Sequence, residues 1–486
     1  MTSLYFCIYV GSGLSALAAT PLAIFLARRF RILDHPRPRS IHSKAVPRTG
    51  GVAIVAAVVA AFVAVMVTMK GLDSGAHLAQ LLAVLIGGLF IAAIGLIDDK
   101  RSLPARVKLL AEVLTALGVW AAGVRIESVR IDHNTIWSLG WASAPITVTW
   151  ILVMVNALNL IDGLDGLAAG ISAIACGTIG FLAILSGQPY LAATSLAIAG
   201  AASGFLVLNT HPAKVFLGDC GSLFLGFMIG SGSAMCVNHS LNVLSLALPA
   251  LAMGVPILDL ALAVVRRVLN RRSVFSPDRS HIHHLMLAMG LNQHHVALLA
   301  YAVSAAAVSI GLFMLTASNY SGLAIFTCIV LLLGVVFHGA GALPFHKMFL
   351  TLRRNLTIVS HFASDKRNFE EAHMQLCLAD NLESWWGGVC QMADLMGFKM
   401  LCMTIEGPDG ASRSLEWRAS SSRFREHGVI SVDLSPESHE PQVSVRLAYE
   451  LPVNGSAELA GRRAALFGRL IDEYAPFRLA AERVAA

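Results

Sequence analysis

Long apolar segments alternate with short polar ones along the first 345 residues of the chain. About eleven of the apolar segments approach the roughly 20 residues that a helix needs to cross a bilayer. The pattern therefore predicts a polytopic α-helical membrane protein with about 11 transmembrane helices. The expected spans lie near residues 4–26, 51–69, 79–97, 107–123, 144–161, 167–186, 189–208, 219–237, 243–265, 295–317 and 321–342.

The apolar segments end near residue 346, and the residues that follow carry many charges. Period-two alternation predicts short strands in KMLCMTIEG, SLEWRAS, GVISVDL and QVSVRLAYEL, with helical patterns before and after them. We therefore expect a transmembrane domain over residues 1–345 and a soluble α/β domain over residues 346–486, loosely similar to GAF domains. Regulation, homodimer formation and binding of another protein are the roles considered for this second domain.

Composition agrees with a chain that lies mostly in the membrane. Hydrophobic residues make up 56% of the chain and charged residues 14%, whereas soluble domains carry about 25% charged residues. None of the eight cysteines belongs to a CxxC pair. We therefore expect neither a disulfide framework nor a thiolate metal site.

The distribution of positive charge predicts how the chain crosses the membrane. Arg28, Arg29 and Arg31 follow the first apolar segment, and no basic residue precedes it. Basic residues next to a span favour the cytoplasmic side, so this segment is expected to be an uncleaved helix with its N-terminus in the periplasm. The odd-numbered loops then face the cytoplasm, and they hold most of the lysines and arginines that lie in loops of residues 1–345. The C-terminus is expected in the cytoplasm.

Nearly every unexpected polar residue lies in these odd-numbered loops, in the segments IGLIDDKRSLPARVK, NALNLIDGLDGLAAG, NTHPAKVFLGDCGSLFLG and VFSPDRSHIHHLMLAMG. Each segment also has a structural interpretation: a charge cluster that ends a span, a polar turn, a helix N-cap, or a solvated histidine face. The candidate site residues, in chain order, are Asp98, Asp99, Lys108, Asn159, Asp162, Asp165, Asn209, Asp219, Arg279, His281, His283 and His284.

Together these residues predict one site on the cytoplasmic face, at membrane depth. Their carboxylate and amide oxygens suit Mg2+, with Mn2+ as the alternative, because Mg2+ takes one or two carboxylates and leaves positions for phosphate oxygens. Lysine, arginine and protonated histidine side chains would hold a diphosphate. Such a position suits a reaction between a lipid substrate and a soluble nucleotide.

The ordered motifs resemble those of the polyprenyl-phosphate N-acetylhexosamine-1-phosphate transferases, whose relatives include phospho-MurNAc-pentapeptide translocase. The segments DHPRPRSIHSKAVPRTGGVAI, GLIDDKRSLPARVKLL, NALNLIDGLDGLAAG, NTHPAKVFLGDCGSL and PILDLALAVVRR occur in the order of that family. SPDRSHIHH resembles the histidine motif of the branch that uses UDP-N-acetylglucosamine. The resemblance implies a multi-pass enzyme of the bacterial inner membrane, which transfers GlcNAc-1-phosphate from a UDP-sugar to undecaprenyl phosphate and releases UMP.

The resemblance also implies partners and roles for the candidate residues. The expected partners are the UDP-sugar, the polyprenyl phosphate lipid and the membrane, without nucleic acid. A second copy of the chain and a downstream glycosyltransferase are the partners considered for the C-terminal domain. Asn159 and Asp219 match the positions linked to Mg2+, and Asp98 matches a residue proposed to deprotonate or position the lipid phosphate. Asp259 and Arg267 match the pattern too and are expected to be structural. The remaining catalytic positions would be Asp99, Lys108, Asp162 and Asp165, and the contacts to the nucleotide sugar would come from Asn209, Arg279, His281, His283 and His284.

Three other functions are weighed against this interpretation. The same enzyme could use UDP-MurNAc-pentapeptide or UDP-N-acetylfucosamine, because the loop over about residues 267–294 does not identify the sugar. A secondary transporter would place its polar residues near the membrane midplane, usually with inverted repeats, and the sequence shows neither feature. A catalytically inactive scaffold would have lost Asp98, Asp219 or the histidines, and all are present.

Overall fold

The structure is a computed structural model in which the chain forms two compact units, Met1–Phe345 and His346–Ala486. The described residues are 1–34, 45–69, 75–130, 136–237, 244–269, 273, 281–288, 290–316, 376, 379, 381–406, 412–419, 429–434, 444–453 and 457–473.

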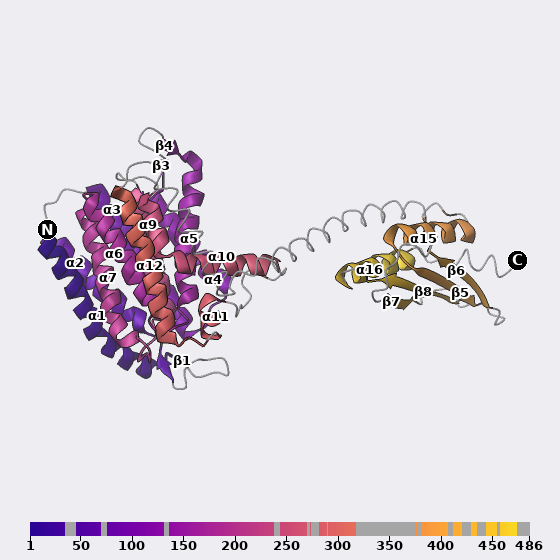
Figure 1. Ribbon diagram of the computed structural model, residues 1–486, viewed down its shortest axis with the longest axis horizontal. Helices are drawn as coiled ribbons and strands as arrows, with labels where there is room; N and C mark the ends of the chain where they lie inside the picture. The colour runs from indigo at the N-terminus through magenta and orange to yellow at the C-terminus, as the bar shows by residue number, and fades with distance from the viewer. Residues whose placement is uncertain are drawn as a thin grey trace. The chain divides into compact units, whose positions relative to one another are not determined.

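The first unit is a helical bundle (Figure 1). Two short antiparallel hairpins interrupt it, β1 (Leu33–Asp34) with β2 (Val46–Pro47) and β3 (Ser128–Arg130) with β4 (Ile136–Ser138). Its helices are α1 (Thr2–Phe30), α2 (Gly50–Thr68), α3 (Gly75–Lys100), α4 (Ala105–Ala121), α5 (Ser143–Ile161), α6 (Leu167–Leu185), α7 (Pro189–Asn209), α8 (Gly218–Val237), α9 (Leu244–Ala252), α10 (Gly254–Leu269), α11 (Ile282–Ala288) and α12 (Gln293–Thr316), with a 3-10 turn at Gly140–Ala142.

The outer helices of this bundle suit a lipid environment. Within the described residues, 7 helices are long and apolar enough to cross a membrane, or up to 8 if a bent pair counts as one span. On α1, the side chains of Phe6, Leu14 and Phe25 are 69%, 61% and 63% exposed. Apolar side chains so widely exposed on a long helix are stable in lipid, not in water. The predicted class, a polytopic α-helical membrane protein, is confirmed.

Helix α8 lies inside the bundle, packed against α2, α3, α5, α6 and α9. Residues 220–236 are all buried, and many of them are glycine, serine or alanine, which let neighbouring helices approach closely. The helix faces protein and not lipid, so it does not need the strongly apolar composition of an outer span. As a result, α8 is held from several sides, which fixes the position of the polar residues at its first turn.

The predicted span over residues 243–265 is not one straight helix. The structure instead has two helices there, α9 and α10, bent by 79° relative to each other. The cause is local, because Pro256 lacks a backbone N–H and its ring clashes with the carbonyl four residues earlier, at Ala252, where α9 ends. The predicted span over residues 321–342 lies outside the described residues.

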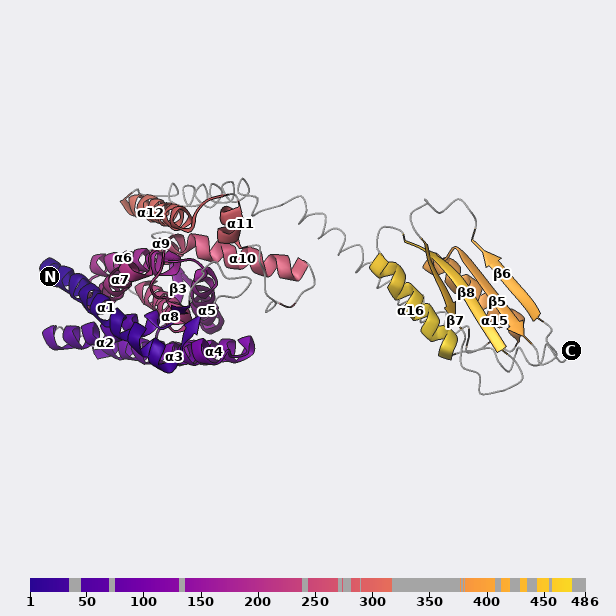
Figure 2. The same cartoon turned by 90° about the horizontal axis from the view of Figure 1, so that it is seen from below.

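The second unit contains a four-stranded antiparallel sheet, drawn in Figure 2, in the order β6-β5-β8-β7. Phe398, Tyr449 and Phe467 meet in its core, with ring centroids 4.6 to 5.3 Å apart. One hydrophobic core therefore joins the helices to the sheet. The elements are α15 (Leu382–Met396), β5 (Met400–Glu406), β6 (Ser412–Arg418), β7 (Val429–Leu434), β8 (Ser444–Pro452) and α16 (Ala457–Glu473).

Candidate functional site

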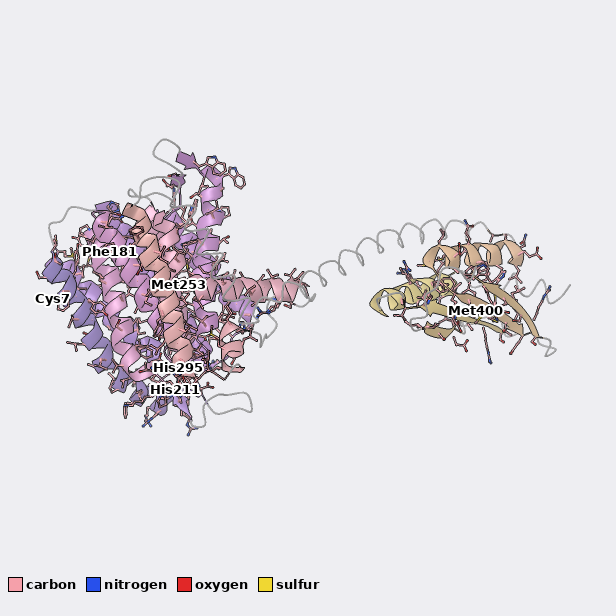
Figure 3. The ribbon with its side chains drawn as sticks, in the orientation of Figure 1. Cys7, Phe181, His211, Met253, His295 and Met400 are labelled. Carbon is pink, nitrogen blue, oxygen red and sulfur yellow. The ribbon has the colours of Figure 1, made fainter. Side chains whose placement is uncertain are left out.

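The polar segments of the sequence meet at one end of the helical bundle. Hydrogen bonds join the ends of α3, α5 and α7 to the beginnings of α4, α6 and α8. Figure 3 shows His211 and His295 at this end of the bundle, and Phe181 toward the opposite end. Residues far apart in the sequence thus lie together at the loops that connect α3 to α4, α5 to α6 and α7 to α8.

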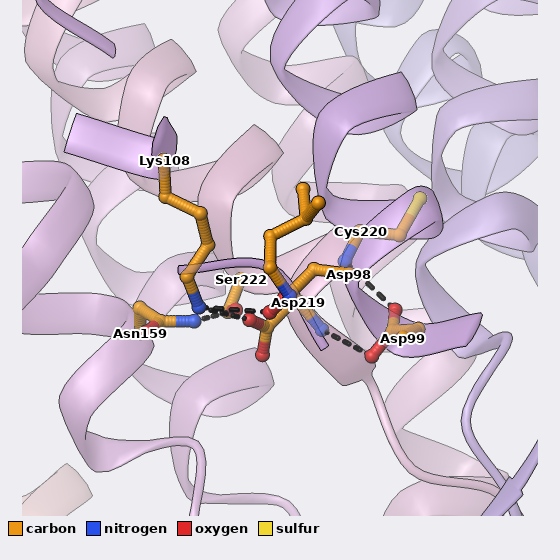
Figure 4. A network of polar contacts seen from close by, with 8 residues as sticks. Asp98, Asp99, Lys108, Asn159, Asp219, Cys220 and Ser222 are labelled. Carbon is orange, nitrogen blue, oxygen red and sulfur yellow. Dashed lines mark hydrogen bonds and ion pairs between the residues drawn. The ribbon is translucent and has the colours of Figure 1, made fainter. Parts of the chain in front are cut away.

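Lys108 forms the centre of the site with two carboxylates (Figure 4). Its Nζ atom donates to Asp98 Oδ2 at 2.8 Å and to Asp219 Oδ2 at 2.9 Å. The three side chains come from α4, α3 and α8 and are only 11–22% exposed. In such a place, ion pairs are screened less than at a protein surface. One ammonium thus holds two carboxylates together and leaves the group with one net negative charge.

Asp99, next to Asp98, binds the first turn of α8. Its Oδ1 atom accepts a hydrogen bond from the backbone amide of Asp219, and its Oδ2 atom accepts one from that of Cys220, both at 3.0 Å. A carboxylate at a helix N-terminus satisfies amides that have no partner within the helix, and it interacts favourably with the helix dipole. Gly218, which precedes them, has a φ of +73°, a backbone conformation that favours glycine. These contacts position Asp219, and a direct catalytic role for Asp99 stays a prediction.

Two further pairs connect α5 to this centre. Asn159 Nδ2 donates to Ser222 Oγ at 2.9 Å, and Ser222 lies one helical turn after Asp219. One turn before Asn159, Asn156 Nδ2 donates to Glu112 Oε2 on α4 at 2.6 Å. Figure 4 shows Asn159 pointing to the same centre as Lys108 and Asp219.

Glu112 and Asn156 were not among the predicted site residues. Glu112 is 3% exposed, and its side chain lies one helical turn after Lys108, on the same face of α4. The sequence does contain a signal for it, because an acidic residue in an apolar membrane segment is rare and usually has a specific partner. Asn156 is that partner, and this pair fixes α4 against α5 beside the centre.

Asp162 lies in the loop between α5 and α6. Burial, and then the negative charges of Asp219 and Asp99, raise the pKa of the Asp162 carboxyl well above its usual range. The positive charge of Arg48 and the backbone amide of Gly218 act in the opposite direction. The carboxyl therefore lies close to the other acidic groups, where a bound cation would favour its ionised form.

Asp165, in the same loop, joins it to the segment between α7 and α8. Its Oδ2 atom lies 2.7 Å from His211 Nδ1 and accepts a hydrogen bond from the Ala213 amide at 3.1 Å. Asn209 makes a second connection, since its Oδ1 accepts from the Gly166 amide at 3.1 Å and its Nδ2 donates to the Val215 carbonyl at 2.8 Å. In this structure Asp165 and Asn209 hold two loops together, and their catalytic and substrate-binding roles stay predictions.

The histidine segment approaches the bundle through α10 and α11. His281 is 6% exposed, and its Nδ1 atom lies 3.3 Å from Asp259 Oδ2. Asp259 Oδ1 accepts a hydrogen bond from the Ile282 amide at 3.0 Å, at the start of α11. Asp259 thus has a structural contact, as expected. His283 and His284 belong to α11, but their side chains, and the whole of Arg279, lie outside the described residues.

The centre has the donor chemistry that Mg2+ requires. Asp98, Asp219 and Asn159 supply carboxylate and amide oxygens, and two of these groups already surround one positive charge, that of Lys108. Within the described part of the chain, no group of three or more His, Cys, Asp or Glu side chains could hold a metal ion by itself. Mg2+ is usually bound through one or two carboxylates and completes its shell with water and substrate phosphates.

The chain is similar to several known proteins. Glycosyl transferase family 4 matches residues 81–237. A probable undecaprenyl-phosphate N-acetylglucosaminyl 1-phosphate transferase of Bacillus subtilis is 38% identical over 61% of this chain and 80% of the relative. A decaprenyl-phosphate N-acetylglucosaminephosphotransferase of Mycobacterium leprae is 35% identical over 58% of this chain and 77% of the relative. A phospho-N-acetylmuramoyl-pentapeptide-transferase of Geobacillus kaustophilus is 32% identical over 62% of this chain and 95% of the relative.

The fold is a bundle of membrane-length helices with a carboxylate–lysine centre at one end. The chain belongs to glycosyl transferase family 4 and is a sugar-phosphate transferase that uses a polyprenyl phosphate acceptor. The family and the enzyme class predicted from the motifs are confirmed. The matches with these relatives cover about three fifths of this chain.

Proposed function

We propose that the enzyme transfers GlcNAc-1-phosphate from UDP-N-acetylglucosamine to undecaprenyl phosphate, releases UMP and so starts the synthesis of a lipid-linked glycan. The observation that carries the proposal is the position of Lys108 between Asp98 and Asp219, at the end of membrane-length helices. The name of the Bacillus subtilis relative supports the choice of this sugar and this lipid.

The reaction needs alignment and charge neutralisation more than covalent help from the protein. An oxygen of the lipid phosphate attacks the β-phosphorus of the UDP-sugar. The bond from this phosphorus to the oxygen that bridges the two phosphates breaks, and UMP leaves with that oxygen. Both substrates are anions, so the site must reduce their mutual repulsion.

Each residue of the centre has its own role in this reaction. Asp98 positions the lipid phosphate and takes its proton where one is present. Lys108 faces the developing negative charge, while Asp162 and Asp165 hold their loop beside the nucleotide. Asn159 and Asp219 would hold Mg2+, which when bound neutralises the phosphate oxygens. The nucleotide diphosphate would be bound by Asn209, Arg279, His281, His283 and His284.

We assign the site to the cytoplasmic face of the bacterial inner membrane, with the N-terminus in the periplasm and the C-terminus in the cytoplasm. The supporting observation is the excess of Lys and Arg in the loops at this end. Figure 1 shows the β3–β4 hairpin at the opposite end of the bundle from β1. In a cysteine-free background, Trp137→Cys on β4 should react with a membrane-impermeant maleimide in intact cells, and Lys214→Cys should react only after lysis. The reverse result would overturn the orientation.

The reaction is tested with purified enzyme, undecaprenyl phosphate, radiolabelled UDP-N-acetylglucosamine and Mg2+. UMP release with a labelled lipid product is expected, with no product in EDTA or with Asp219→Ala. Asp433→Ala, which removes an exposed carboxylate on β7 of the second unit, is the matched control and should keep full activity. Turnover only with UDP-MurNAc-pentapeptide or UDP-N-acetylfucosamine would change the sugar. Turnover with none of them, in folded protein, would overturn the proposal.

A further inference from the structure

Gly166 ends the loop that carries Asp162 and Asp165, and its backbone is held from two sides. Its amide donates to Asn209 Oδ1 at 3.1 Å, and its carbonyl accepts a hydrogen bond from the Tyr301 hydroxyl at 2.7 Å. Its φ of +80° is one that a side chain would strain. The path of the loop into α6 therefore depends on contacts that reach it from α7 and from α12.

Tyr301 is fitted closely against α6. Its ring lies over Gly170, one helical turn after Gly166, and a Cβ atom on Gly170 would clash with the Tyr301 Cζ atom. The missing side chain at Gly170 thus makes the space that the ring occupies. With its ring and its hydroxyl both fixed, Tyr301 joins α12 to the beginning of α6 at one defined point.

We propose that Tyr301 is a positioning residue for sugar-phosphate transfer: by binding the Gly166 carbonyl, it fixes the loop that presents Asp162 and Asp165 to the substrates. The inference rests on the proposed function. Tyr301 acts through the loop, because its hydroxyl binds a backbone carbonyl. Helix α12 also packs against α11, so the helix that carries Tyr301 borders the histidine segment as well as the carboxylate loop.

Tyr301→Phe is the direct test, because it removes the hydroxyl and keeps the ring that fills the space over Gly170. Tyr190→Phe is the matched control: the Tyr190 hydroxyl also donates to a backbone carbonyl at 2.7 Å, that of Met69, at the end of α7 remote from Asn209. Both variants should lower the melting temperature in detergent by similar amounts. Only Tyr301→Phe should reduce kcat, by about tenfold, with less than about threefold change in KM for either substrate.

Two further measurements separate positioning from general destabilisation. In an Asp162→Asn background, Tyr301→Phe should reduce kcat by less than about threefold, because effects that pass through one loop are not additive. Hydrogen exchange should increase over residues 162–170 in Tyr301→Phe and stay unchanged there in Tyr190→Phe. Equal kcat in the two variants, full additivity with Asp162→Asn, or unchanged exchange in the loop would each overturn the inference. An inactive wild type would overturn the proposed function instead, and the exchange experiment would still decide whether Tyr301 holds the loop.

Discussion

Asp99 at the end of α3 accepts a hydrogen bond from the backbone amide of Asp219 at the beginning of α8. The same carboxylate also binds the next amide, of Cys220, so it serves as a cap for a helix to which it does not belong. The two acidic residues therefore differ in role although both belong to predicted site motifs. One side chain sets the backbone position of the other, whose carboxylate reaches Lys108.

Replacing Asp99 with Asn should therefore reduce stability and activity together. An amide can accept only one of the two hydrogen bonds and turns its NH2 group toward the other helix amide, which costs about 1–3 kcal/mol for the group left unsatisfied. We expect a lower melting temperature in detergent and a decrease of kcat, because Asp219 moves with the first turn of α8. Asp98→Asn should instead reduce kcat with a smaller loss of stability. A fully stable but inactive Asp99→Asn enzyme would show that this carboxylate acts on the substrates directly.

The helices around this contact could be predicted from the sequence, because apolar length is a local property of the chain. The strands of the second unit could also be placed, since their alternation has a period of two. The break between α9 and α10 was missed because apolar length alone was used to define that span, although Pro256 was available as a signal. A proline inside a predicted helix is a reason to expect a bend at the residue four positions earlier.

The candidate site was only partly predictable for a different reason. Asp98, Lys108 and Asp219 are unusual residues in their segments, so composition pointed to them, and the structure brings them into contact. Which residue binds which is a tertiary property. The use of Asp99 as a helix cap and the contact of Tyr301 with a backbone carbonyl depend on packing between distant segments, which spacing in one sequence does not encode.

Removing the Lys108 ammonium should destabilise the site as well as stop catalysis. Lys108→Met would leave Asp98 and Asp219 facing each other without the cation between them, and a mostly buried pair that loses one partner is destabilised by about 3 kcal/mol. We expect a loss of turnover and a lower melting temperature, with the temperature partly restored by Mg2+. Lys108→Met/Asp98→Asn, which also removes one negative charge, should recover stability and stay inactive. If the double variant were less stable than Lys108→Met, charge repulsion would not be the cause.

Asp162 predicts a pH dependence of stability. Its pKa is raised in the folded protein, so folding favours the protonated carboxyl. The contribution of this group to the free energy of unfolding is therefore complete below the unfolded pKa of about 3.9. It declines as pH rises through the folded pKa. Asp162→Asn removes this decline. In EDTA, the melting temperature of the variant relative to the wild type should therefore rise as pH increases, while its kcat is reduced. A difference that is the same at every pH would contradict the raised pKa.

Glu112 should contribute to activity by holding α4 in place, with its charge unnecessary for this. Its Oε2 atom accepts a hydrogen bond from Asn156 on α5, and Lys108 lies one turn earlier on the same helix. Glu112→Gln keeps an acceptor oxygen on a side chain of similar size and should retain activity within about threefold of the wild type. Glu112→Leu instead leaves the Asn156 amide against an apolar side chain and should lose about 1–3 kcal/mol of stability. Because α4 carries Lys108, the leucine variant should also lose kcat with little change in KM. Measurement of kcat, KM and melting temperature for both variants decides the matter: a glutamine variant as inactive as the leucine variant would mean that the Glu112 charge itself takes part in the reaction.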